Sequence, residues 1–337
     1  MNVAAMWKVI GSGRVGALRS LASVMGEYTR ACFLVAAARA GVLARLAGGP
    51  QTLEQLRVAL ESGALDEVRA WLDVGVALGE LRRDARGYRL RGTLARALAE
   101  AKNDDLLAML EELTDLHHRL VLETPARAKR GARFALADHA SDVIARSSRL
   151  LEPFVEAAIA RAVPAAGPVR VLEVGCGSGT YLRFMSERNP ELRAVGLDLS
   201  AAVVEQARAN LAAWGVADRV SVARCDLREH APDAPYDLVT LHNNIYYFPT
   251  AERVAVLSRV RELLAPNGSV LLTTATPGGS PSGTVLNLWG AMTEGCGPLP
   301  EPRELLEQMG RAGFASCRAE DLMGPLDRFH AFYGART

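Results

Sequence analysis

The sequence predicts an α/β protein in two parts, a mainly helical first half followed by a parallel sheet flanked by helices. After residue 168, short apolar runs alternate with amphipathic helices, which is the pattern of a parallel α/β sheet. Before residue 163 the pattern is helical and rich in Ala, Leu and Arg. The stretch 163–168 between them holds two prolines and a glycine, which indicates a domain edge.

Composition agrees with two globular domains and excludes several classes of protein. The 337 residues are 49% hydrophobic and 23% charged, enough to bury a core in each domain. A net charge of +1 creates no strong field for nucleic acid or an anionic membrane. No apolar run is long enough to cross a bilayer. Five scattered cysteines without a CxxC pair argue against disulfides and zinc, so we expect a cytoplasmic protein.

The first half predicts three helices and a hairpin. An apolar helix over 32–46 ends at Gly48-Gly49-Pro50, and Thr52 with Gln55 forms a capping box for the next helix. A third helix covers 68–76, and two short strands flank a turn at 84–87. This order is the plan of a winged helix. We therefore expect a helical, winged-helix-like domain over 1–105 and a helical linker over 106–165.

The region 166–337 predicts a seven-stranded, mostly parallel sheet. Apolar runs bounded by turn residues indicate its strands, and amphipathic segments between them indicate helices. The strands are expected at 169–174, 192–197, 220–223, 236–241, 269–274, 314–319 and 329–333, and the helices at 181–188, 201–214, 251–264 and 303–311.

A glycine-rich turn between the first of these strands and its helix is the strongest functional signal. Glycines there permit a tight turn and leave no Cβ between the backbone and a ligand. The N–H groups at the helix start are available to a polar group. The candidate residues are Glu173, Gly175, Cys176, Gly177 and Gly179.

Two acidic residues end the next two strands. Asp198, about 20 residues after the glycines, is spaced to accept both hydroxyls of a ribose. Asp226 ends the third strand, where it could reach an adenine amino group. Each is followed by a leucine, Leu199 and Leu227. Because ligands of open α/β sheets bind at the carboxyl ends of the strands, these features predict one crevice for a nucleotide-like ligand.

Together these motifs resemble class I S-adenosylmethionine (SAM)-dependent methyltransferases, which have a Rossmann-like sheet. The resemblance rests on the E-x-G-x-G-x-G loop, Asp198, Asp226 and the segments 236–239 and 263–269. It implies that the chain binds SAM, with the glycine loop beside the methionine portion, and releases S-adenosylhomocysteine (SAH). It implies no metal.

The winged-helix-like first half extends the resemblance to the two-domain small-molecule O-methyltransferases of plants and actinomycetes. In that group the N-terminal domain forms a homodimer and helps to cover the substrate. The resemblance therefore implies a homodimer through 1–105 and a substrate pocket to which 106–165 contributes.

These enzymes carry a His-Asp-Trp segment after the fourth strand, in which the His is the general base. Here His242 matches the base, followed by Asn243, also an expected cofactor contact, and Asn244. The family's orienting Glu after the fifth strand is absent, because 274–276 read Thr-Ala-Thr; Glu301 stands near a second partner position. Two interpretations stay open: His242 takes a proton from the acceptor, or it is a pocket wall.

Aromatic and apolar residues near this crevice are the candidate substrate contacts. They predict an aromatic or apolar acceptor, and the aromatic rings could also hold a cation. Core packing is the competing interpretation. The residues are Tyr246, Tyr247, Phe248, Trp289 and Met292.

The predicted function is methyl transfer from SAM to an O, N or activated C atom of a small molecule, such as a secondary metabolite. The alternative is a SAM-binding homologue that hydroxylates or decarboxylates instead.

DNA binding by the arginine-rich turn at 82–91 is disfavoured by the weak net charge. The GxGxxG match at 11–16 lacks the following strand of a dinucleotide site, so we interpret 1–28 as an arm or helix start whose role stays open. Adjacent His117 and His118 would point to different faces of a helix, which predicts no metal site.

Overall fold

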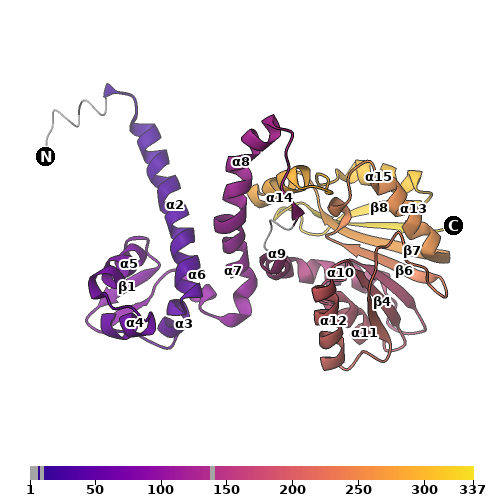
Figure 1. The fold of residues 1–337 in the computed structure, drawn as a ribbon, viewed down its shortest axis with the longest axis horizontal. Helices are drawn as coiled ribbons and strands as arrows, with labels where there is room; N and C mark the ends of the chain where they lie inside the picture. The colour runs from indigo at the N-terminus through magenta and orange to yellow at the C-terminus, as the bar shows by residue number, and fades with distance from the viewer. Residues whose placement is uncertain (1–6, 8–10, 137–140) are drawn as a thin grey trace. The chain divides into compact units, whose positions relative to one another are not determined.

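The computed structural model of the chain describes residues 7, 11–136 and 141–337. It divides into two compact units, one made of 1–119 and 140–150 and the other of 120–139 and 151–337. Figure 1 shows helices in the first unit and a sheet with helices in the second. Within the described residues, no helix is long and apolar enough to cross a membrane.

The first unit is helical apart from one hairpin. Strands β1 and β2 pair antiparallel around a turn that closes at Gly87, as the sequence predicts. The capping box of Thr52 and Gln55 is present, so the predicted start of that helix is confirmed. The elements are α2 (Val15–Arg39), α3 (Val42–Ala47), α4 (Leu53–Ala59), α5 (Leu65–Ala77), β1 (Leu81–Asp84), β2 (Gly87–Leu90), α6 (Thr93–Leu98), η1 (Ala101–Asn103), α7 (Asp104–Glu111), η2 (Glu112–His117), α9 (Ser141–Ser147) and η4 (Ser148–Leu151).

Helix α2 differs from the sequence prediction. The single helix expected over 32–46 is two helices, because Gly41 adopts a left-handed φ of 70° that stops α2 and starts α3. At its other end α2 begins at Val15 and takes in the end of the GxGxxG match, so that motif is a helix start. The preceding Val9-Ile10 lies outside the described residues.

The second unit is built on a seven-stranded sheet in the order β5-β4-β3-β6-β7-β9-β8. The first five of these strands pair parallel, and β9 joins antiparallel between β7 and β8. The predicted seven strands are therefore confirmed. Their bounds are β3 (Arg170–Val174), β4 (Arg193–Asp198), β5 (Val220–Arg224), β6 (Tyr236–His242), β7 (Leu264–Ala275), β8 (Ala315–Asp321) and β9 (Phe329–Ala335).

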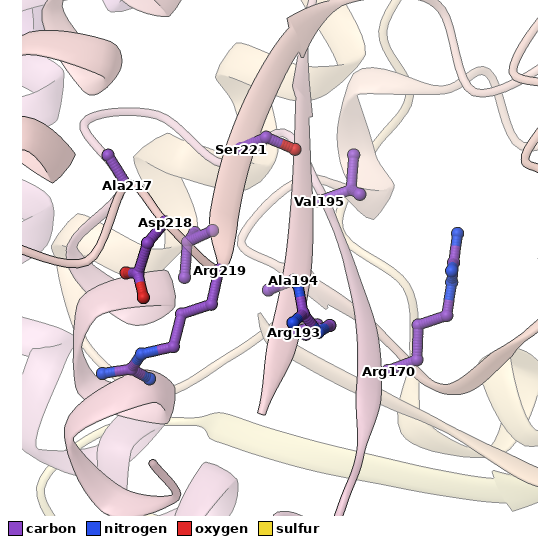
Figure 2. Close-up of a pocket in the computed structure, with 9 residues that line it drawn as sticks. Arg170, Arg193, Ala194, Val195, Ala217, Asp218, Arg219 and Ser221 are labelled. Carbon is purple, nitrogen blue, oxygen red and sulfur yellow. The ribbon is translucent and has the colours of Figure 1, made fainter. Parts of the chain in front are cut away.

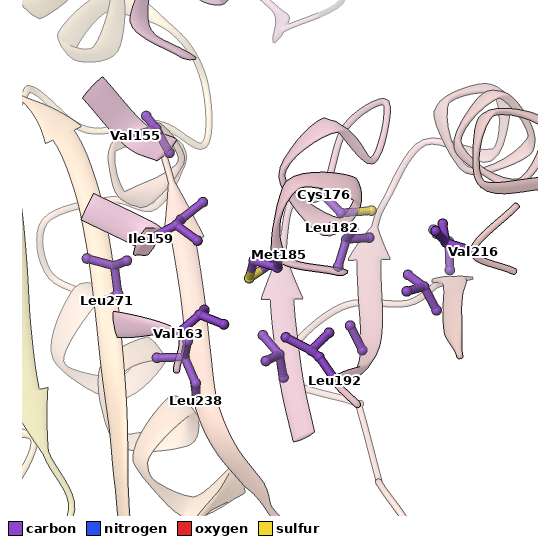
Figure 3. Packing of buried hydrophobic residues seen from close by; sticks show 14 of the residues in the cluster. Val155, Ile159, Val163, Cys176, Leu182, Met185, Leu192, Val216, Leu238 and Leu271 are labelled. Atoms are coloured by element: carbon purple, nitrogen blue, oxygen red, sulfur yellow. The ribbon is translucent and has the colours of Figure 1, made fainter. Parts of the chain in front are cut away.

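Helices cover both faces of this sheet. One face packs against α10, α11 and α12, and the other against α13 and α15. Figure 3 shows Val155, Ile159 and Val163, at and just after α10, following one another along the first face. The helices are α8 (His118–Lys129), α10 (Glu152–Ala162), α11 (Thr180–Arg188), α12 (Ala201–Ala213), α13 (Arg253–Leu263), α14 (Pro281–Met292) and α15 (Pro302–Arg311), with a 3-10 turn η5 (Ile245–Tyr247).

Strand β7 begins earlier than the sequence predicts. It starts at Leu264 and runs through Pro266 and Asn267, where a helix end and turn are expected. Asn267 takes a left-handed φ of 65°, and the register between β6 and β7 shifts near Tyr236. This irregularity accommodates a proline that a regular central strand excludes.

The strand order places a topological switch point at one edge of the sheet. The chain runs outward from β3 to β4 and β5, then returns to β6 on the other side of β3. The connections therefore diverge between the carboxyl ends of β3 and β6, with β4 next to β3, and such a point is where α/β folds bind ligands.

Candidate functional site

The glycine turn after β3 is open to a ligand and strained for any other residue. Gly175, Gly177 and Gly179 have φ values of 68°, 53° and 83°, all in the left-handed region. A Cβ on Gly175 would stand 2.8 Å from Asn244 Nδ2, so the turn has no room for a side chain there. Cys176 N donates to Leu197 O at 2.9 Å, which ties the turn to β4.

Asp198 supports this turn from the end of β4. Its Oδ2 accepts from Gly177 N at 3.2 Å, and its Oδ1 accepts from Ser200 N at 3.0 Å. The side chain of Ser200 caps α12, as predicted. The structure thus brings together the predicted glycine turn and the predicted acidic residue. Asp198 stabilises the turn through these hydrogen bonds, whether or not it also contacts a ligand.

Glu173 is a buried carboxyl beneath the same turn. Glu173 is 1% exposed, and its Oε2 has no hydrogen-bond partner among the described residues. Burial raises the pKa of Glu173 well above its usual range, and the nearby Asp198 carboxylate raises it further. A buried polar atom without a partner is costly, so this oxygen points to a ligand that would complete it.

Asp226 is engaged by a neighbour that the sequence reasoning missed. Arg228 donates from Nη2 to Asp226 Oδ2 at 2.7 Å and from Nε to Oδ1 at 3.0 Å, and its backbone N donates to Oδ1 at 2.8 Å. These hydrogen bonds hold the pKa of Asp226 below its usual range. Of the two predicted leucines, Leu227 is buried and Leu199 is 65% exposed.

His242 ends β6 on the same face of the sheet as Glu173. Its Nδ1 and Thr273 Oγ1 are hydrogen-bonded at 2.9 Å, and its Nε2 is buried without a partner among the described residues. Burial lowers the pKa of His242 to about 3. The group that contacts His242 Nδ1 is thus the hydroxyl of Thr273, one residue before the 274–276 segment in which a glutamate was absent. Glu301 instead precedes α15 as its N-cap residue.

Tyr181 is a second neighbour of His242 that the sequence reasoning missed. It stands in the first turn of α11, and its ring packs edge-on against His242 with centroids 4.9 Å apart. No motif singles it out. Its place in the first turn of the helix that follows the glycine turn is the feature of the sequence that indicates a position near the site.

The segment after β6 is fastened to the neighbouring strands. Asn243 takes a left-handed φ of 52° and donates from its backbone N to Thr273 O at 2.7 Å. The Asn244 amide donates from Nδ2 to Val174 O. The structure therefore places the side chain of Asn244 against the glycine turn, whereas the sequence prediction named Asn243.

Three of the five predicted substrate contacts form an aromatic group. The Tyr246 and Tyr247 rings stack at 5.2 Å, and Trp289 from α14 meets them edge-on at 5.9 and 5.3 Å. Phe248 packs against the core of the α13 face, and Met292 ends α14, where its carbonyl accepts from Phe134 N at 2.8 Å.

Arg253 stabilises the backbone segments next to the aromatic group of Tyr246, Tyr247 and Trp289. It is fully buried, and it donates from Nε to Phe248 O at 3.2 Å and from Nη2 to Pro298 O at 2.5 Å. Gly297 N donates in turn to Tyr246 O at 2.9 Å. The arginine therefore fastens the segment that carries Tyr246 and Phe248 to the 297–299 segment that follows α14.

A depression of about 210 Å³ lies at the opposite, amino-terminal edge of the sheet. Its lining includes Arg170, Arg193, Asp218 and Arg219, at or near the starts of β3, β4 and β5. Figure 2 shows the Arg170 and Arg219 guanidinium groups pointing away from each other, and Arg170 pairs with Asp233. This depression is separate from the predicted crevice, and its cations do not converge on a ligand.

Within the described residues, no three His, Cys, Asp or Glu side chains lie together as a metal site would require. His117 lies in η2 with its Nε2 3.3 Å from Glu112.

Comparison with known proteins gives a match for the central part of the second unit. Residues 172–270, from β3 into β7, match the family described as a methyltransferase domain. The chain has the fold of class I methyltransferases, and the match to the family covers residues 172–270. The structure of the mitomycin 7-O-methyltransferase MmcR matches 97% of this chain and 100% of its own, with a TM-score of 0.80 at 17% identity. Human N-acetylserotonin methyltransferase, solved in complex with SAM, matches 95% and 97%, with a TM-score of 0.72 at 17% identity. The predicted two-domain fold is thereby confirmed.

Curated relatives align with about a third of the chain. Trans-aconitate 2-methyltransferase of Streptomyces avermitilis is 31% identical over 103 residues, which is 31% of this chain and 38% of that protein. The chain thus aligns with about two fifths of the length of this relative.

Proposed function

We propose that this chain is a SAM-dependent methyltransferase that moves a methyl group to an O, N or activated C atom of a small molecule. The observation that supports it is the polar edge at the carboxyl ends of β3, β4 and β6. At this edge lie the glycine turn, with left-handed φ values at Gly175, Gly177 and Gly179, and two buried polar atoms, Glu173 Oε2 and His242 Nε2, that have no partner among the described residues.

The residues at this edge fit SAM. The unpartnered Glu173 carboxyl suits a cationic group, the glycine turn allows close approach, and exposed Leu199 offers an apolar surface to an adenine ring. When bound, SAM supplies an electrophilic methyl group. We assign its binding to the predicted set: Glu173, Gly175, Cys176, Gly177, Gly179, Asp198, Leu199, Asp226, Leu227 and Asn243.

His242 has the chemistry of a hydrogen-bonding group rather than of a strong base. Burial keeps the ring neutral at pH 7, and the Thr273 hydroxyl cannot stabilise an imidazolium as a carboxylate would. In this proposal its Nε2 orients the acceptor, and the rate depends on positioning the two reactants. Tyr246, Tyr247, Phe248, Trp289 and Met292 would supply the acceptor wall.

The hydroxyl of Thr273, rather than a carboxylate, contacts His242 Nδ1, and this favours the second candidate, a SAM-binding homologue that hydroxylates or decarboxylates its substrate. The two candidates differ in product. Methyl transfer converts SAM to SAH once per acceptor, whereas the alternative leaves SAM unchanged. Stoichiometric SAH release during turnover therefore decides between them.

Asp198→Ala is expected to weaken SAM binding at least about a hundredfold from a micromolar value. The substitution removes a carboxylate placed for the ribose and also releases Gly177 N, and charge-assisted hydrogen bonds of this kind contribute about 1.5–3 kcal/mol each. Isothermal titration with SAM measures the loss. Asp218→Asn, at the opposite edge of the sheet, is the control and should bind like the wild type. A wild-type protein that does not bind SAM would overturn the proposal.

We also propose that the chain forms a homodimer through residues 1–105. Helix α2 exposes apolar side chains at the i, i+3, i+7 and i+10 spacing of a helix–helix seam. Monomers rarely expose such a continuous apolar stripe. Its members are Leu18, Leu21, Met25 and Tyr28, each about half exposed or more.

Introducing two charges into this stripe is expected to produce a monomer. Leu21→Glu combined with Met25→Glu would bury unpaired carboxylates in the interface, and we expect the dimer dissociation constant to rise at least about a hundredfold. Light scattering after gel filtration measures the mass. Ser23→Glu, on the opposite side of α2, is the matched control and should leave the mass unchanged. A wild-type monomer at micromolar concentration would contradict this proposal.

A further inference from the structure

Glu173 has weakly polar and apolar neighbours on the β4 side of its strand. Strands β3 and β4 pair in register, which puts Glu173 beside Gly196. A Cβ on Gly196 would stand 2.8 Å from Cys176 Sγ and 2.7 Å from Leu182 Cδ1, so these two side chains fill the space over the glycine. Figure 3 shows Cys176 and Leu182 side by side. The groups over this register partner of Glu173 are therefore a thiol and a hydrocarbon chain.

The β6 neighbour of Glu173 is a threonine that bonds to the backbone instead. Thr240 is the register partner of Glu173 on this side, and it is fully buried. Its hydroxyl donates to Leu172 O at 3.5 Å, so its hydrogen points to the backbone of β3 rather than to the carboxyl group. Glu173 Oε2 accordingly has no hydrogen-bond partner among the described residues, although the residue is only 1% exposed.

The titratable groups around Glu173 are acidic or neutral. Asp198 is the charged group that acts on it, and its carboxylate is held by the hydrogen bonds from Gly177 N and Ser200 N. The ring of His242 is neutral, because burial lowers its pKa to about 3. A buried carboxyl group beside a second carboxylate keeps its proton. The titratable groups of the elements around Glu173 are Asp198 of β4, Cys176 of the glycine turn, Tyr181 of α11, His242 of β6 and, beyond Tyr181, Glu152 and Glu156 of α10.

Glu173 is placed to accept the α-ammonium group of a bound SAM. In the proposed function the glycine turn, which follows Glu173 directly, borders the methionine portion that carries this group. An ammonium group has three donors and no acceptor, so it can satisfy the open Oε2. Its positive charge also favours the carboxylate form of Glu173 over the protonated form. The state of Glu173 that suits the free protein is therefore not the state that suits the complex.

We propose that Glu173 carries a proton before SAM binds and releases it to the solvent when SAM binds. The inference rests on the proposed function and concerns the regulation of the same site by pH. The O–H bond of the carboxyl group breaks, the buffer takes the proton, and the ammonium group keeps its own protons as it pairs with the carboxylate. Because binding releases a proton, SAM affinity should rise with pH, approaching about tenfold per pH unit where free Glu173 is protonated.

The number of protons released is measured by isothermal titration with SAM at pH 6.5 in phosphate and in imidazole. These buffers differ widely in their enthalpy of ionisation, so the dependence of the observed binding enthalpy on the buffer gives the proton count. We expect at least about 0.5 proton released per SAM, whereas a glutamate of ordinary pKa, about 4.3, would release almost none at this pH. The His242 ring stays neutral at pH 6.5 and does not contribute.

A ligand without the ammonium group is the first control. 5′-Methylthioadenosine keeps the adenosine and the sulfur of SAM but lacks its amino-acid portion, and it should bind without releasing a proton. SAH, which keeps the ammonium group, should release as many protons as SAM. Equal proton release with SAM and 5′-methylthioadenosine would contradict the role of the ammonium group.

Glu173→Gln is expected to abolish proton release, because glutamine has the shape of the protonated carboxyl group and cannot ionise. The variant should bind SAM about tenfold or more weakly than the wild type at pH 7.5, with a smaller difference at pH 5.5. Glu205→Gln, on the exposed side of α12, makes the same substitution where the glutamate pairs with Arg208. This matched control should keep the wild-type proton count and affinity. Thermal melting establishes that both variants fold, and the wild-type count tests the proposal even if Glu173→Gln does not.

Two results would overturn the inference while leaving the proposed function intact. SAM binding to the wild type without proton release would show that Glu173 is already ionised or stays protonated in the complex. Proton release that persists in folded Glu173→Gln would assign the proton to another group. A wild type that does not bind SAM would instead overturn the proposed function, and this inference with it.

Discussion

Replacing Gly175 with alanine is expected to weaken SAM binding at least about a hundredfold and to destabilise the protein by about 2–4 kcal/mol. Two costs add. The left-handed φ of 68° disfavours any Cβ by about 1–2 kcal/mol. The new Cβ would also stand 2.8 Å from Asn244 Nδ2, so the amide must give up its hydrogen bond to Val174 O. Both the turn and the β6 segment beside it would shift.

The control for this experiment separates backbone strain from collision. Gly215, which follows α12, has a similar φ of 71°, and nothing lies within 4 Å of the Cβ it would gain. Gly215→Ala should therefore cost about 1–2 kcal/mol of stability and leave SAM affinity unchanged. Urea unfolding and SAM titration of both variants measure the two quantities. Wild-type SAM affinity in Gly175→Ala would show that the cofactor does not approach this turn.

Local signals explain why most of the fold could be predicted. The capping box at Thr52, the Ser200 cap and the apolar runs of the buried strands act within a few residues, so a single sequence displays them. The glycine turn and Asp198 could be assigned to one site because parallel strands bring their carboxyl ends to one edge. Their hydrogen bond confirms that placement.

The missed features depend on contacts between distant segments. Thr273 orients His242 only because β6 and β7 pair in register, and the sequence could show merely that the usual carboxylate was absent. Tyr181 reaches His242 through the packing of α11 on the sheet. Arg228 holds Asp226 two residues away, yet nothing in the sequence indicates that its side chain turns back. Each of these contacts depends on a side-chain direction or a strand register that a single sequence does not display.

The stability of the protein is expected to rise with pH between about 3 and 6.5 through His242. The pKa of the ring is about 3 in the folded protein and about 6.5 in the unfolded chain, so between these values only the unfolded state binds the proton. Stability from this group is complete above pH 6.5 and falls as the pH decreases toward 3. The full difference corresponds to up to about 5 kcal/mol at 1.36 kcal/mol per pH unit.

His242→Gln should remove this slope while keeping a polar side chain beside Thr273. Urea unfolding of the wild type and the variant at pH 4.5, 5.5, 6.5 and 7.5 gives the difference in the free energy of unfolding. We expect this difference to favour the variant increasingly as the pH falls. Glu173→Gln provides a control of opposite sign, because the raised pKa of Glu173 stabilises the fold at low pH and loses that effect as the pH rises through it. Parallel curves for the wild type and His242→Gln would mean that His242 is hydrated, and a hydrated ring with an ordinary pKa would restore the general-base interpretation.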